Sequence, residues 1–495
     1  MFESAVCGPW SASRPAAAIV AALIAGCSSS TGPVPTRSIA VTVGSKVVGH
    51  LGLATSTSFQ PATYDSWNFT SNPGGPSELA ALNPQHVRLQ SLSDGNPATT
   101  ATTWDFSTLD AAAQPVLGVG DHSPEMQLGQ GPSFMYSSSG SLLDTTGQQF
   151  AAYAANMVRY YNTGGFAAAD GNHVSPSQNH VTWWGIYNEP NINNVSASQY
   201  VALYNNTVPA MLAVDPTIKL VAGEVTGDLW SVQNYLPLAL GGLHTHVDAV
   251  AIHLYSTCGQ ATGDSILMST VPTFAQSVLT ARAVEANNPA TAGAPIWITE
   301  NNVDADYNLG NGVSACNGNT FTVDARGSSA FFAAWRPYVF SQVGKAGAQA
   351  LYHWVFFGDA QYGEINVSSG AREIAYWVDH ALVSSFPAQP GASILAVTSS
   401  DSTDVEVLAV QNPDSSAVVM IANHRVAHAN DNNGRGAPLA IQVDLTALGS
   451  FRTATTTSID ASTDPSAGPT PVSGAATPTM TVRLAGYGVM FIALK

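Results

Sequence analysis

Two glutamates at the ends of apolar runs are the side chains of this sequence best placed to do chemistry. Glu189 ends the run VTWWGIYNE, whose β-branched and aromatic residues indicate a buried strand. Pro190 cannot continue the hydrogen-bond ladder of a strand, so the strand must stop at Glu189. Glu300 ends a second run of this kind, PIWITE. A carboxylate at a strand tip is solvated, paired with a cation, or available for catalysis.

Other polar residues fall at or near the ends of similar runs. The runs that indicate strands are KVVGHLGLA (46–54), HVRLQSL (86–92), PVLGVGDH (115–122), VTWWGIYNE (181–189), IKLVAGE (218–224), VDAVAIHLY (247–255), PIWITE (295–300) and ALYHWVFF (350–357). The polar or aromatic residues that they carry there are Arg88, Asp121, His122, Asn188, Glu189, Glu224, His253, Tyr255, Glu300, His353 and Trp354. A purely structural domain has little reason to gather such residues at strand ends.

The elements around these runs predict the architecture. Helical patterns lie between most of the runs, and the last of them is REIAYWVDHALVSSF (372–386). Alternating strands and helices over residues 37–387 predict a (β/α)8 TIM barrel, an α/β fold that carries its active site at the carboxyl ends of the strands. From about residue 388 to 495, strands follow one another without helices, which predicts a C-terminal all-β sandwich. The segment SIAVTV (38–43) is a candidate to pair with that sandwich.

The predicted barrel brings the two glutamates together. The fourth and seventh strands of an eight-stranded barrel face each other across its mouth, so Glu189 and Glu300 are expected to meet there. Two carboxyl groups about 5–5.5 Å apart suit a retaining glycosidase, in which one attacks the anomeric carbon and the other protonates the leaving oxygen.

These two roles require carboxyl groups with different pKa values. We expect Arg88 and Tyr255 to keep the attacking carboxylate ionised. We expect Trp183 or Trp184 to enclose Glu189 and keep it protonated.

The motifs around both glutamates resemble those of clan A glycoside hydrolases, and of family 39 in particular. The matching segments are N-E-P-N at 188–191 and I-T-E-x-N at 298–302. The resemblance implies that Glu189 is the acid/base and Glu300 the nucleophile. It also implies that Asn188 contacts the sugar 2-hydroxyl, that His253 and Tyr255 line the catalytic subsite, and that Trp354 stacks on the sugar. Asn301 stands where family members commonly have tryptophan, which weakens the transfer of their β-xylosidase specificity.

Several candidate residues also have a plainer interpretation. Arg88 is assigned to the substrate site, although it could instead pair with the barrel floor. His122, also assigned to the substrate site, and Glu224 fit a rim position as well as a subsite contact. Glu364 is expected to be a solvated loop charge, and Asp304 and Asp306 are expected in a solvated loop. The sequence shows no zinc pattern and no complete calcium loop, so we expect no metal and no cofactor.

The first residues predict an exported protein. Residues 1–26 combine Arg14 with a short apolar stretch, as a bacterial signal peptide does, and Leu-Ile-Ala-Gly-Cys27 resembles a lipobox in which the cysteine is lipidated. Ordinary cleavage nearby is the alternative. Residues 27–36 read as a tether. We therefore expect a cell-surface or membrane-anchored lipoprotein, or otherwise a secreted or periplasmic protein, whose membrane contact is limited to a lipid anchor.

The net charge limits the possible partners, and the cysteines indicate which loops are neighbours. The formal net charge of −17 argues against a nucleic-acid partner and leaves a neutral polysaccharide or oligosaccharide as the expected one. The sequence does not determine the oligomeric state. Cys258 and Cys316 follow the sixth and seventh strands, in loops that are neighbours in a barrel. In an oxidising compartment they are expected to form a disulfide.

The sequence supports three functions. The first is an exported retaining glycoside hydrolase that cleaves O-glycosidic bonds of a polysaccharide or oligosaccharide through two glutamates. The second is a transglycosylase that uses the same residues. The third is a non-catalytic carbohydrate-binding surface lipoprotein, against which the presence of both carboxylates argues.

Overall fold

The computed structural model places most of the chain that follows the predicted tether. It describes residues 37–59, 69, 71–72, 74–91, 95–119, 123–177, 179–259, 262–387 and 390–495. The predicted signal peptide, the tether with Cys27, and His122 lie outside the described residues.

Eight parallel strands close into a barrel, which confirms the predicted fold class. Their order around the barrel is β10-β11-β2-β3-β4-β7-β8-β9. The strands are β2 (Ala54–Phe59), β3 (Val87–Gln90), β4 (Glu125–Gln127), β7 (Trp183–Gly185), β8 (Lys219–Thr226), β9 (Ala249–Thr257), β10 (Ile296–Asp304) and β11 (Ala350–His353).

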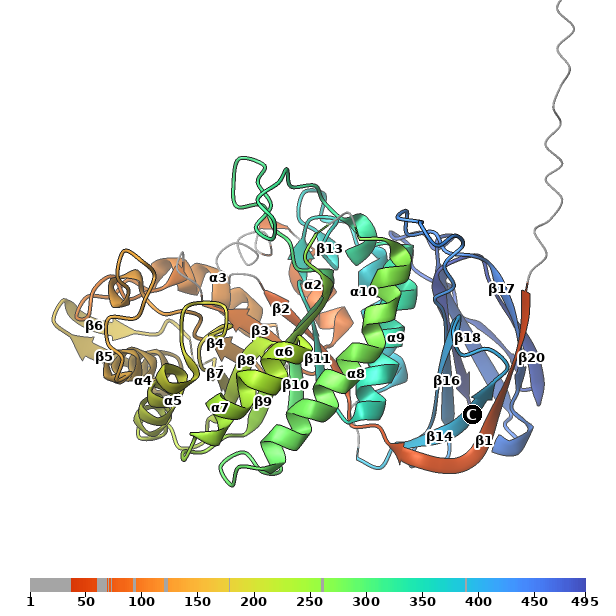
Figure 1. The fold of residues 1–495 in the computed structure, drawn as a ribbon, viewed down its shortest axis with the longest axis horizontal. Helices are drawn as coiled ribbons and strands as arrows, with labels where there is room; N and C mark the ends of the chain where they lie inside the picture. Colours follow the sequence, from red (N-terminus) through yellow and green to blue (C-terminus); the bar gives the residue numbers. More distant parts are fainter. Residues whose placement is uncertain are drawn as a thin grey trace, which may run out of the picture. The chain divides into compact units, whose positions relative to one another are not determined.

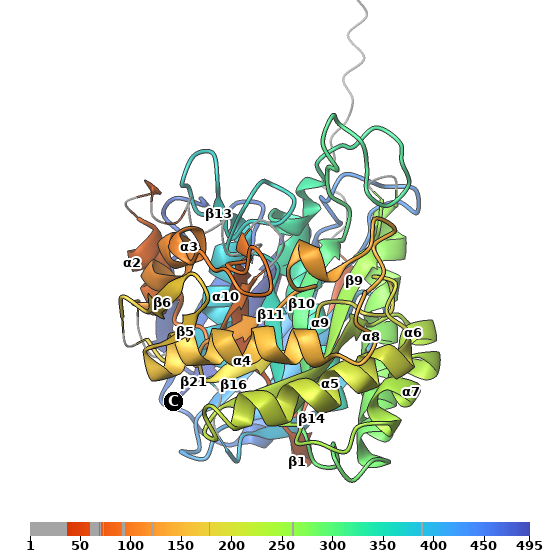
Figure 2. The ribbon, with the colours of Figure 1, turned by 90° about the vertical axis from the view of Figure 1, so that its left-hand side faces the viewer.

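Helices surround this barrel (Figures 1 and 2). They are α2 (Gly75–Leu82), α3 (Ser107–Leu117), α4 (Gln148–Thr163), α5 (Ala197–Leu212), α6 (Leu229–Asn234), α7 (Leu236–Gly241), α8 (Asp264–Ala286), α9 (Ala330–Ala346) and α10 (Ile374–Ser385). Figure 2 shows α4 and α5 lying side by side across the front of that view. Short pairs, β5 (Gly165–Ala168) with β6 (Gly171–Val174) and β12 (Phe357–Gly358) with β13 (Ile365–Asn366), decorate the connections.

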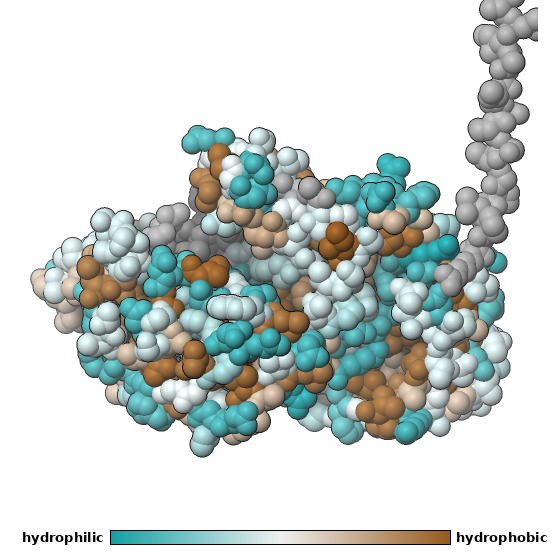
Figure 3. Space-filling model, in the orientation of Figure 1, coloured by the Kyte–Doolittle hydropathy of each residue, from teal (hydrophilic) through white to brown (hydrophobic). Residues whose placement is uncertain are grey.

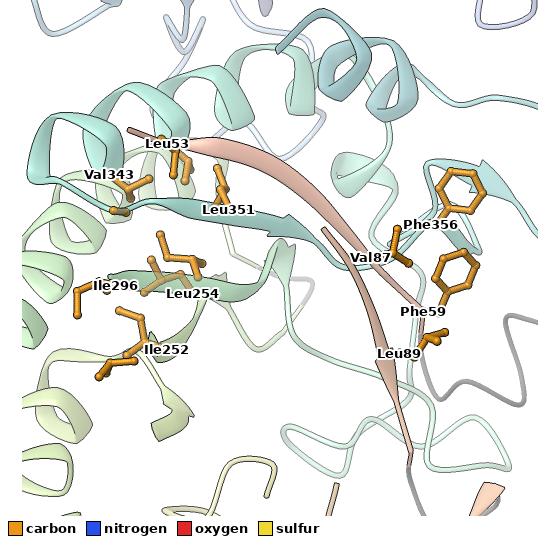
Figure 4. Close-up of a cluster of buried hydrophobic side chains, with 14 of the residues drawn as sticks. Leu53, Phe59, Val87, Leu89, Ile252, Leu254, Ile296, Val343, Leu351 and Phe356 are labelled. Carbon is orange, nitrogen blue, oxygen red and sulfur yellow. The ribbon is translucent and has the colours of Figure 1, made fainter. Parts of the chain in front are cut away.

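The alternation of side chains along the strands decides which residues face the helices and which face the barrel interior. Val87 and Leu89 of β3, and Ile252 and Leu254 of β9, belong to the apolar cluster that the helices cover (Figure 4). Successive side chains of a strand point to opposite faces, so Arg88, between the two β3 residues, points into the barrel. The same alternation turns the polar residues of β9 inward.

The first barrel strand differs from the predicted one. The run 46–54 was expected to open the barrel, but most of it belongs to β1 (Arg37–His50), where Val47 and Val48 are exposed. The barrel begins instead with ATSTSF in β2, whose six residues are all buried. Three of its hydroxyl groups find partners inside the protein. Thr57 Oγ1 donates to Glu364 at 3.0 Å, Ser58 Oγ donates to Thr299 O at 3.4 Å, and Ser56 Oγ accepts from His86 N at 3.2 Å. Because a Ser/Thr-rich strand lacks apolar character, hydropathy did not reveal it.

The third predicted strand, 115–122, is also wrong. Residues 107–117 form helix α3, which buries Leu109, Ala112, Ala113 and Val116 at helical spacing and contains Pro115. The strand follows as Glu-Met-Gln in β4, and all three residues are buried. Glu125 and Gln127 alternate with an apolar residue, so both polar side chains share the inward face.

The C-terminal strands form the predicted sandwich. A nine-stranded sheet has the order β19-β18-β21-β16-β15-β14-β1-β17-β20 and wraps around one apolar cluster to which strands from both of its halves contribute. Its strands are β14 (Ser393–Ser399), β15 (Val405–Gln411), β16 (Ala417–Asn423), β17 (Leu439–Asp444), β18 (Thr453–Asp460), β19 (Val472–Ala475), β20 (Thr479–Leu484) and β21 (Gly488–Leu494). Strand β1 pairs with β14 antiparallel and with β17 parallel, so the segment 38–43 lies within the sandwich sheet (Figure 1).

Barrel and sandwich share a continuous core. The apolar cluster around the barrel extends to Met420 of β16 and Phe491 of β21, and helix α9 packs against the same two strands. Helix α9 is buried on nearly all sides, as expected for a helix between two layers. Polar contacts add to the interface: Glu406 of β15 accepts hydrogen bonds from Gln342 and Lys345 of α9 at 3.0 and 2.5 Å.

The surface is mixed in character. Figure 3 shows hydrophobic residues in small, separate groups among polar ones on the face that it presents, a common arrangement for a folded domain. Among the described residues, no helix is both long and apolar enough to span a membrane.

Because the barrel and the sandwich share a buried interface, we expect them to unfold together. Asp264, fully buried at the start of α8, pairs with Arg326 at 3.0 Å and accepts hydrogen bonds from Gly434 N at 3.0 Å and Tyr487 OH at 3.3 Å in the sandwich region. We expect Asp264→Ala to destabilise the whole protein by about 3 kcal/mol because it leaves buried donors and a cation without this partner. Calorimetry should show one transition at a lower Tm.

The matched control for this change is Asp414→Ala. Asp414 is fully exposed and bonds only to Ser416 in its own turn, so its removal should leave the transition in place. Two separate transitions in the wild type, or an unchanged Tm in Asp264→Ala, would contradict a shared core.

Candidate active site

Glu189 and Glu300 meet at the mouth of the barrel. A carboxylate oxygen of each, together with a ring nitrogen of His253, lies within 4.8 Å of the others. The side chain of Glu189 is 18% exposed and that of Glu300 is 7% exposed. A substrate can therefore reach both carboxylates, and their spacing is that of two groups acting on one bond.

Two donors hold the Glu300 carboxylate. Arg88 Nη1 donates to Oε1 at 3.1 Å, and Tyr255 OH donates to Oε2 at 2.8 Å. Burial raises the pKa of Glu300 above its ordinary value, while the charges of His253 and Arg88 oppose the shift. The contacts expected from Arg88 and Tyr255 are thus present, but the effect of burial on the pKa of Glu300 is larger than theirs.

The expected enclosure of Glu189 by tryptophan is wrong. Trp183 points into a small apolar cluster with Trp297 and Ala350. These residues lie at the amino ends of their strands, so the cluster fills the end of the barrel opposite to Glu189 and Glu300. Trp184 points outward into the helix layer. Since Glu189 lies beyond the strand itself, neither side chain reaches it, and Glu300 is the more enclosed carboxylate.

His253 bridges the acidic groups. Its Nδ1 lies 2.9 Å from Glu189 Oε1 and 3.5 Å from Glu300 Oε2, and its Nε2 lies 2.9 Å from Glu224 Oε2. Burial disfavours the charged ring, but the charge of Glu300 and the bonds to Glu189 and Glu224 raise the pKa of His253 to about 10. The ring is therefore a charged imidazolium at neutral pH, and its nitrogens donate to the carboxyl groups of Glu189 and Glu224.

Glu224 lies beneath the catalytic pair and not on the rim. It is fully buried and contacts Arg88 Nη2 at 3.2 Å and Thr299 Oγ1 at 2.8 Å. Burial acts against its ionisation, yet Arg88 and then His253 and Thr299 bring the pKa of Glu224 down to about 2. Its negative charge holds the two cations, Arg88 and His253, that lie beside Glu189 and Glu300.

The backbone at these glutamates is unusual. Glu189 and Glu224 have φ values of 45° and 48°, in the left-handed region that non-glycine residues rarely adopt. The pairing of β8 with β9 also shifts register between Gly223 and Val225, which re-aims the side chain between them. Glu189 N donates to Glu224 O at 2.8 Å, so the two strained positions support each other.

Strand β4 supplies residues of the candidate site that hydropathy did not reveal. Gln127 Nε2 donates to Tyr187 O at 2.5 Å and to Asn188 Oδ1 at 3.3 Å, and so orients the asparagine next to Glu189. A Cβ on Gly185 would lie within 3.0 Å of Gln127, Glu224 and Glu125 atoms, so only glycine leaves room for this polar cluster. The alternation of polar and apolar residues in Glu-Met-Gln was the only feature of the sequence that could have indicated this strand.

Asn188 and Trp354 line the cavity that contains the two glutamates, and their contacts with a sugar stay a prediction. Asn188 Oδ1 also accepts from Arg88 Nη2 at 3.4 Å, which leaves its amide nitrogen free of these two contacts. Trp354 lines a cavity of about 300 Å³ together with Asn188, Glu189, Glu300 and Tyr255. The predicted site residues of strands two, four, six, seven and eight thus converge, while His122 lies outside the described residues.

Three carboxylates that were expected in solvated loops are buried. Glu364, Asp304 and Asp306 are at most 1% exposed. Asp304 Oδ1 accepts hydrogen bonds from Gly259 N at 3.0 Å and from Asp306 N at 2.9 Å. Because two backbone amides donate to the same oxygen, this carboxylate organises a loop, and sequence pattern alone does not show that.

Among the described residues, two groups each bring three possible metal-ligand atoms within 4.8 Å of one another. In both groups, hydrogen-bond donors of the protein already contact the carboxylates. The first is Glu189, His253 and Glu300, where the imidazolium already donates to carboxylates. The second is His353, Glu364 and Asp379. There Arg336 Nε donates to Asp379 Oδ1 at 2.9 Å, and a guanidinium at this distance repels a cation.

The predicted disulfide between Cys258 and Cys316 is confirmed, with Cα atoms 5.5 Å apart. It joins the loop after β9 to the loop after β10. Both cysteines, together with Glu189 and His253, line a second cavity beside the first.

Glu125 predicts a pH dependence of stability. Burial, then the charge of Glu224, raises the pKa of Glu125 from 4.5 to about 8 in the folded protein. Between those pH values the unfolded chain releases the proton and the folded protein keeps it, so stability must fall as pH rises. Glu125→Gln removes this loss. Urea unfolding from pH 5 to 8 should show the variant gaining on the wild type by up to about 1.4 kcal/mol per pH unit.

A control separates this effect from packing. Gln127→Ala alters the same strand without removing a titrating group, so its stability should keep the wild-type slope with pH. Parallel slopes for Glu125→Gln and the wild type would contradict the assignment of the buried proton.

The disulfide predicts a second stability difference. Closing 58 residues of chain stabilises by about 4 kcal/mol in the chain-entropy model. We expect the double change Cys258→Ser and Cys316→Ser to lower the free energy of unfolding by about that amount, measured on a chain that begins at residue 37. Thiol titration of that wild-type chain in denaturant should detect no free thiol, and two reactive thiols would refute the bond.

No protein-family model matches the sequence, and no curated protein matches it.

The fold, in contrast, is shared with glycoside hydrolases of known structure. A GH39 β-xylosidase from Caulobacter crescentus matches with a TM-score of 0.58 at 16% identity, over 93% of this chain and 100% of its own. A GH51 arabinofuranosidase from Xanthomonas axonopodis pv. citri matches with a TM-score of 0.63 at 12% identity, over 92% and 100%. A GH30 endoxylanase from Clostridium papyrosolvens C71 matches with a TM-score of 0.57 at 16% identity, over 93% and 100%. The chain therefore shares its fold, a barrel with a β-sandwich, with these glycoside hydrolases, which include a member of the family 39 that the motifs around Glu189 and Glu300 resemble.

Proposed function

We propose that this protein is a retaining glycoside hydrolase that cleaves O-glycosidic bonds of a polysaccharide or oligosaccharide. The observation that carries the proposal is the approach of carboxylate oxygens of Glu189 and Glu300 to within 4.8 Å. Retaining enzymes hold the two carboxyl groups about 5–5.5 Å apart, whereas inverting enzymes leave about 6.5–9.5 Å for a water molecule. Glycoside hydrolases of the same fold support the proposal.

Glu300 is proposed as the nucleophile. Arg88 and Tyr255 aim its carboxylate through one hydrogen bond to each oxygen, and the cations Arg88 and His253 lie close by. In the first step Glu300 bonds to the anomeric carbon while the bond to the leaving oxygen breaks. The charge of the carboxylate disappears as the ester forms, and it returns when water breaks the ester.

Glu189 is proposed as the acid and then the base. It is the more accessible of the two carboxyl groups, and His253 Nδ1 orients it at 2.9 Å. It gives its proton to the leaving oxygen in the first step and takes a proton from water in the second, so it ends the cycle in its starting state. Asn188, held by Arg88 and Gln127, presents its amide to the sugar in the same cavity.

Export is part of the proposal. The Cys258–Cys316 disulfide supports an oxidising compartment, which agrees with the signal peptide and the lipidated Cys27 expected from the sequence. We place the protein outside the cytoplasm, attached to a membrane only through that lipid.

Substitution of each glutamate tests the assignment. Glu300→Ala should lose at least about 10³-fold in kcat on aryl xylosides, glucosides or arabinofuranosides, because no nucleophile remains. Added azide should restore turnover and yield a glycosyl azide of inverted configuration. Glu189→Ala should retain much more activity on 2,4-dinitrophenyl glycosides than on alkyl glycosides, because a good leaving group needs no proton.

The same panel contains the contradicting outcomes. Activity of both variants at the wild-type level, or NMR detection of an inverted hydrolysis product from the wild type, would reject the proposed mechanism. Arg336→Lys is the control for disturbed packing near the site. Arg336 contacts neither Glu189 nor Glu300 but bonds to Asn301 beside Glu300, so its change should show how much activity packing alone removes.

A further inference from the structure

Two segments that line the cavity of Glu189 and Glu300 meet at one backbone carbonyl. The 305–324 loop follows β10, and the 354–364 segment follows β11. The cavity-lining residues that they supply are Ala305, Tyr307, Trp354 and Tyr362. The carbonyl oxygen of Asp306 accepts hydrogen bonds from two consecutive residues of the 354–364 segment, Gln361 and Tyr362. The two parts of the cavity wall are therefore joined through Asp306.

Gln361 uses both ends of its side-chain amide in this connection. Its Nε2 donates to Asp306 O at 2.5 Å, and its Oε1 accepts from Asp324 N at 3.0 Å. Asp306 and Asp324 lie at the two ends of the 305–324 loop, so one amide closes the loop at its base. Gln361 is fully buried, and a buried hydrogen bond is costly to lose because water does not replace the missing partner.

The groups on either side of this amide are fixed as well. A Cβ on Gly327 would lie 1.8 Å from Gln361 O, so the main chain of Gln361 packs where only glycine leaves room. Asp324 Oδ1 accepts from Arg326 Nε at 2.8 Å, and Arg326 Nη1 donates to Asp264 Oδ1 at 3.0 Å. Asp264 is the carboxylate that also bonds to the sandwich region. Gln361 therefore ties the cavity wall to a point that the interface with the sandwich holds.

Resting on the proposed function, we propose that Gln361 is a positioning residue, which joins the 305–324 loop and the 354–364 segment into one ordered wall of the substrate cavity. Gln361 does not itself line this cavity, so it acts on a sugar only through the residues that it holds. A wall that is ordered in advance loses little conformational entropy when a sugar binds. Loss of Gln361 should therefore weaken binding of the substrate and of the transition state alike.

The two carboxyl groups that act on the bond have other supports. Arg88 and Tyr255 bond to Glu300, and His253 bonds to Glu189. Because none of these bonds involves Gln361, a bound substrate should still react at nearly the normal rate. The expected signature of a Gln361 variant is a raised KM with little change in kcat.

Steady-state kinetics and covalent trapping test this signature. Gln361→Met keeps the length of the side chain and removes both amide bonds. On whichever aryl xyloside, glucoside or arabinofuranoside the wild type cleaves fastest, we expect KM to rise about tenfold and kcat to stay within about threefold. With the matching 2-deoxy-2-fluoro glycoside, the concentration for half-maximal inactivation should rise in parallel, and mass spectrometry should still find the ester on Glu300.

A second variant and a matched control guard against misfolding. Tyr362→Phe keeps the ring in the cavity and removes the other donor to Asp306 O, so it should change KM in the same direction. Gln342→Met removes a comparable amide bond, to Glu406 at the sandwich interface, and should leave KM unchanged. Hydrogen exchange of the 305–324 loop should accelerate in Gln361→Met and not in Gln342→Met.

The outcomes separate this role from the proposed function. An active wild type whose KM changes in neither Gln361→Met nor Tyr362→Phe would overturn the positioning role alone. A fall in kcat at unchanged KM would also overturn it. A wild type that cleaves no aryl glycoside and forms no ester on Glu300 would reject the proposed function, and the role in substrate binding with it, even where hydrogen exchange shows that Gln361 holds the loop.

Discussion

The ion cluster around Arg88 is the constraint on which the site depends. A guanidinium that is fully buried costs several kcal/mol unless carboxylates surround it. Arg88 contacts Glu224 at 3.2 Å and Glu300 at 3.1 Å, so the same pairing that makes the barrel interior stable also places the nucleophile candidate. Removal of either partner would leave a buried charge, which links stability and geometry at this point.

The charges in this cluster balance without Glu189. At neutral pH, Arg88 and His253 are positive and Glu224 is negative, while Glu125 keeps its proton because its pKa is about 8. As the nucleophile of the proposed reaction, Glu300 must be ionised at rest, and its charge then matches the second positive charge. Glu189 can therefore exchange a proton with a substrate without leaving the buried cluster unbalanced, as an acid/base must.

A second buried network connects the strand of Glu300, β10, to the sandwich. Asn301, directly after Glu300, accepts from Arg336 Nη1 at 2.7 Å and donates to Leu254 O at 2.6 Å. Its carbonyl accepts from Trp354 N at 3.2 Å. Arg336 belongs to α9, the helix that packs on the sandwich. The sandwich thus braces the helix whose arginine holds the strand of Glu300, and Asn301 makes contacts that a tryptophan there could not reproduce.

The sequence by itself determined the features that follow from hydrophobic periodicity and from residues, such as proline, that end a strand. The runs before Glu189 and Glu300 predicted two barrel strands and placed both glutamates toward their carboxyl ends, although β7 already ends at Gly185 and β10 continues to Asp304. The barrel and most of its site could therefore be predicted. Tertiary structure decided the rest because a barrel interior buries polar side chains, which reverses the usual link between polarity and exposure. Hydropathy therefore missed ATSTSF and Glu-Met-Gln as strands and assigned Glu364 to solvent. Which face a tryptophan occupies, and which carboxylate is the more enclosed, depended on contacts between strands far apart in the chain.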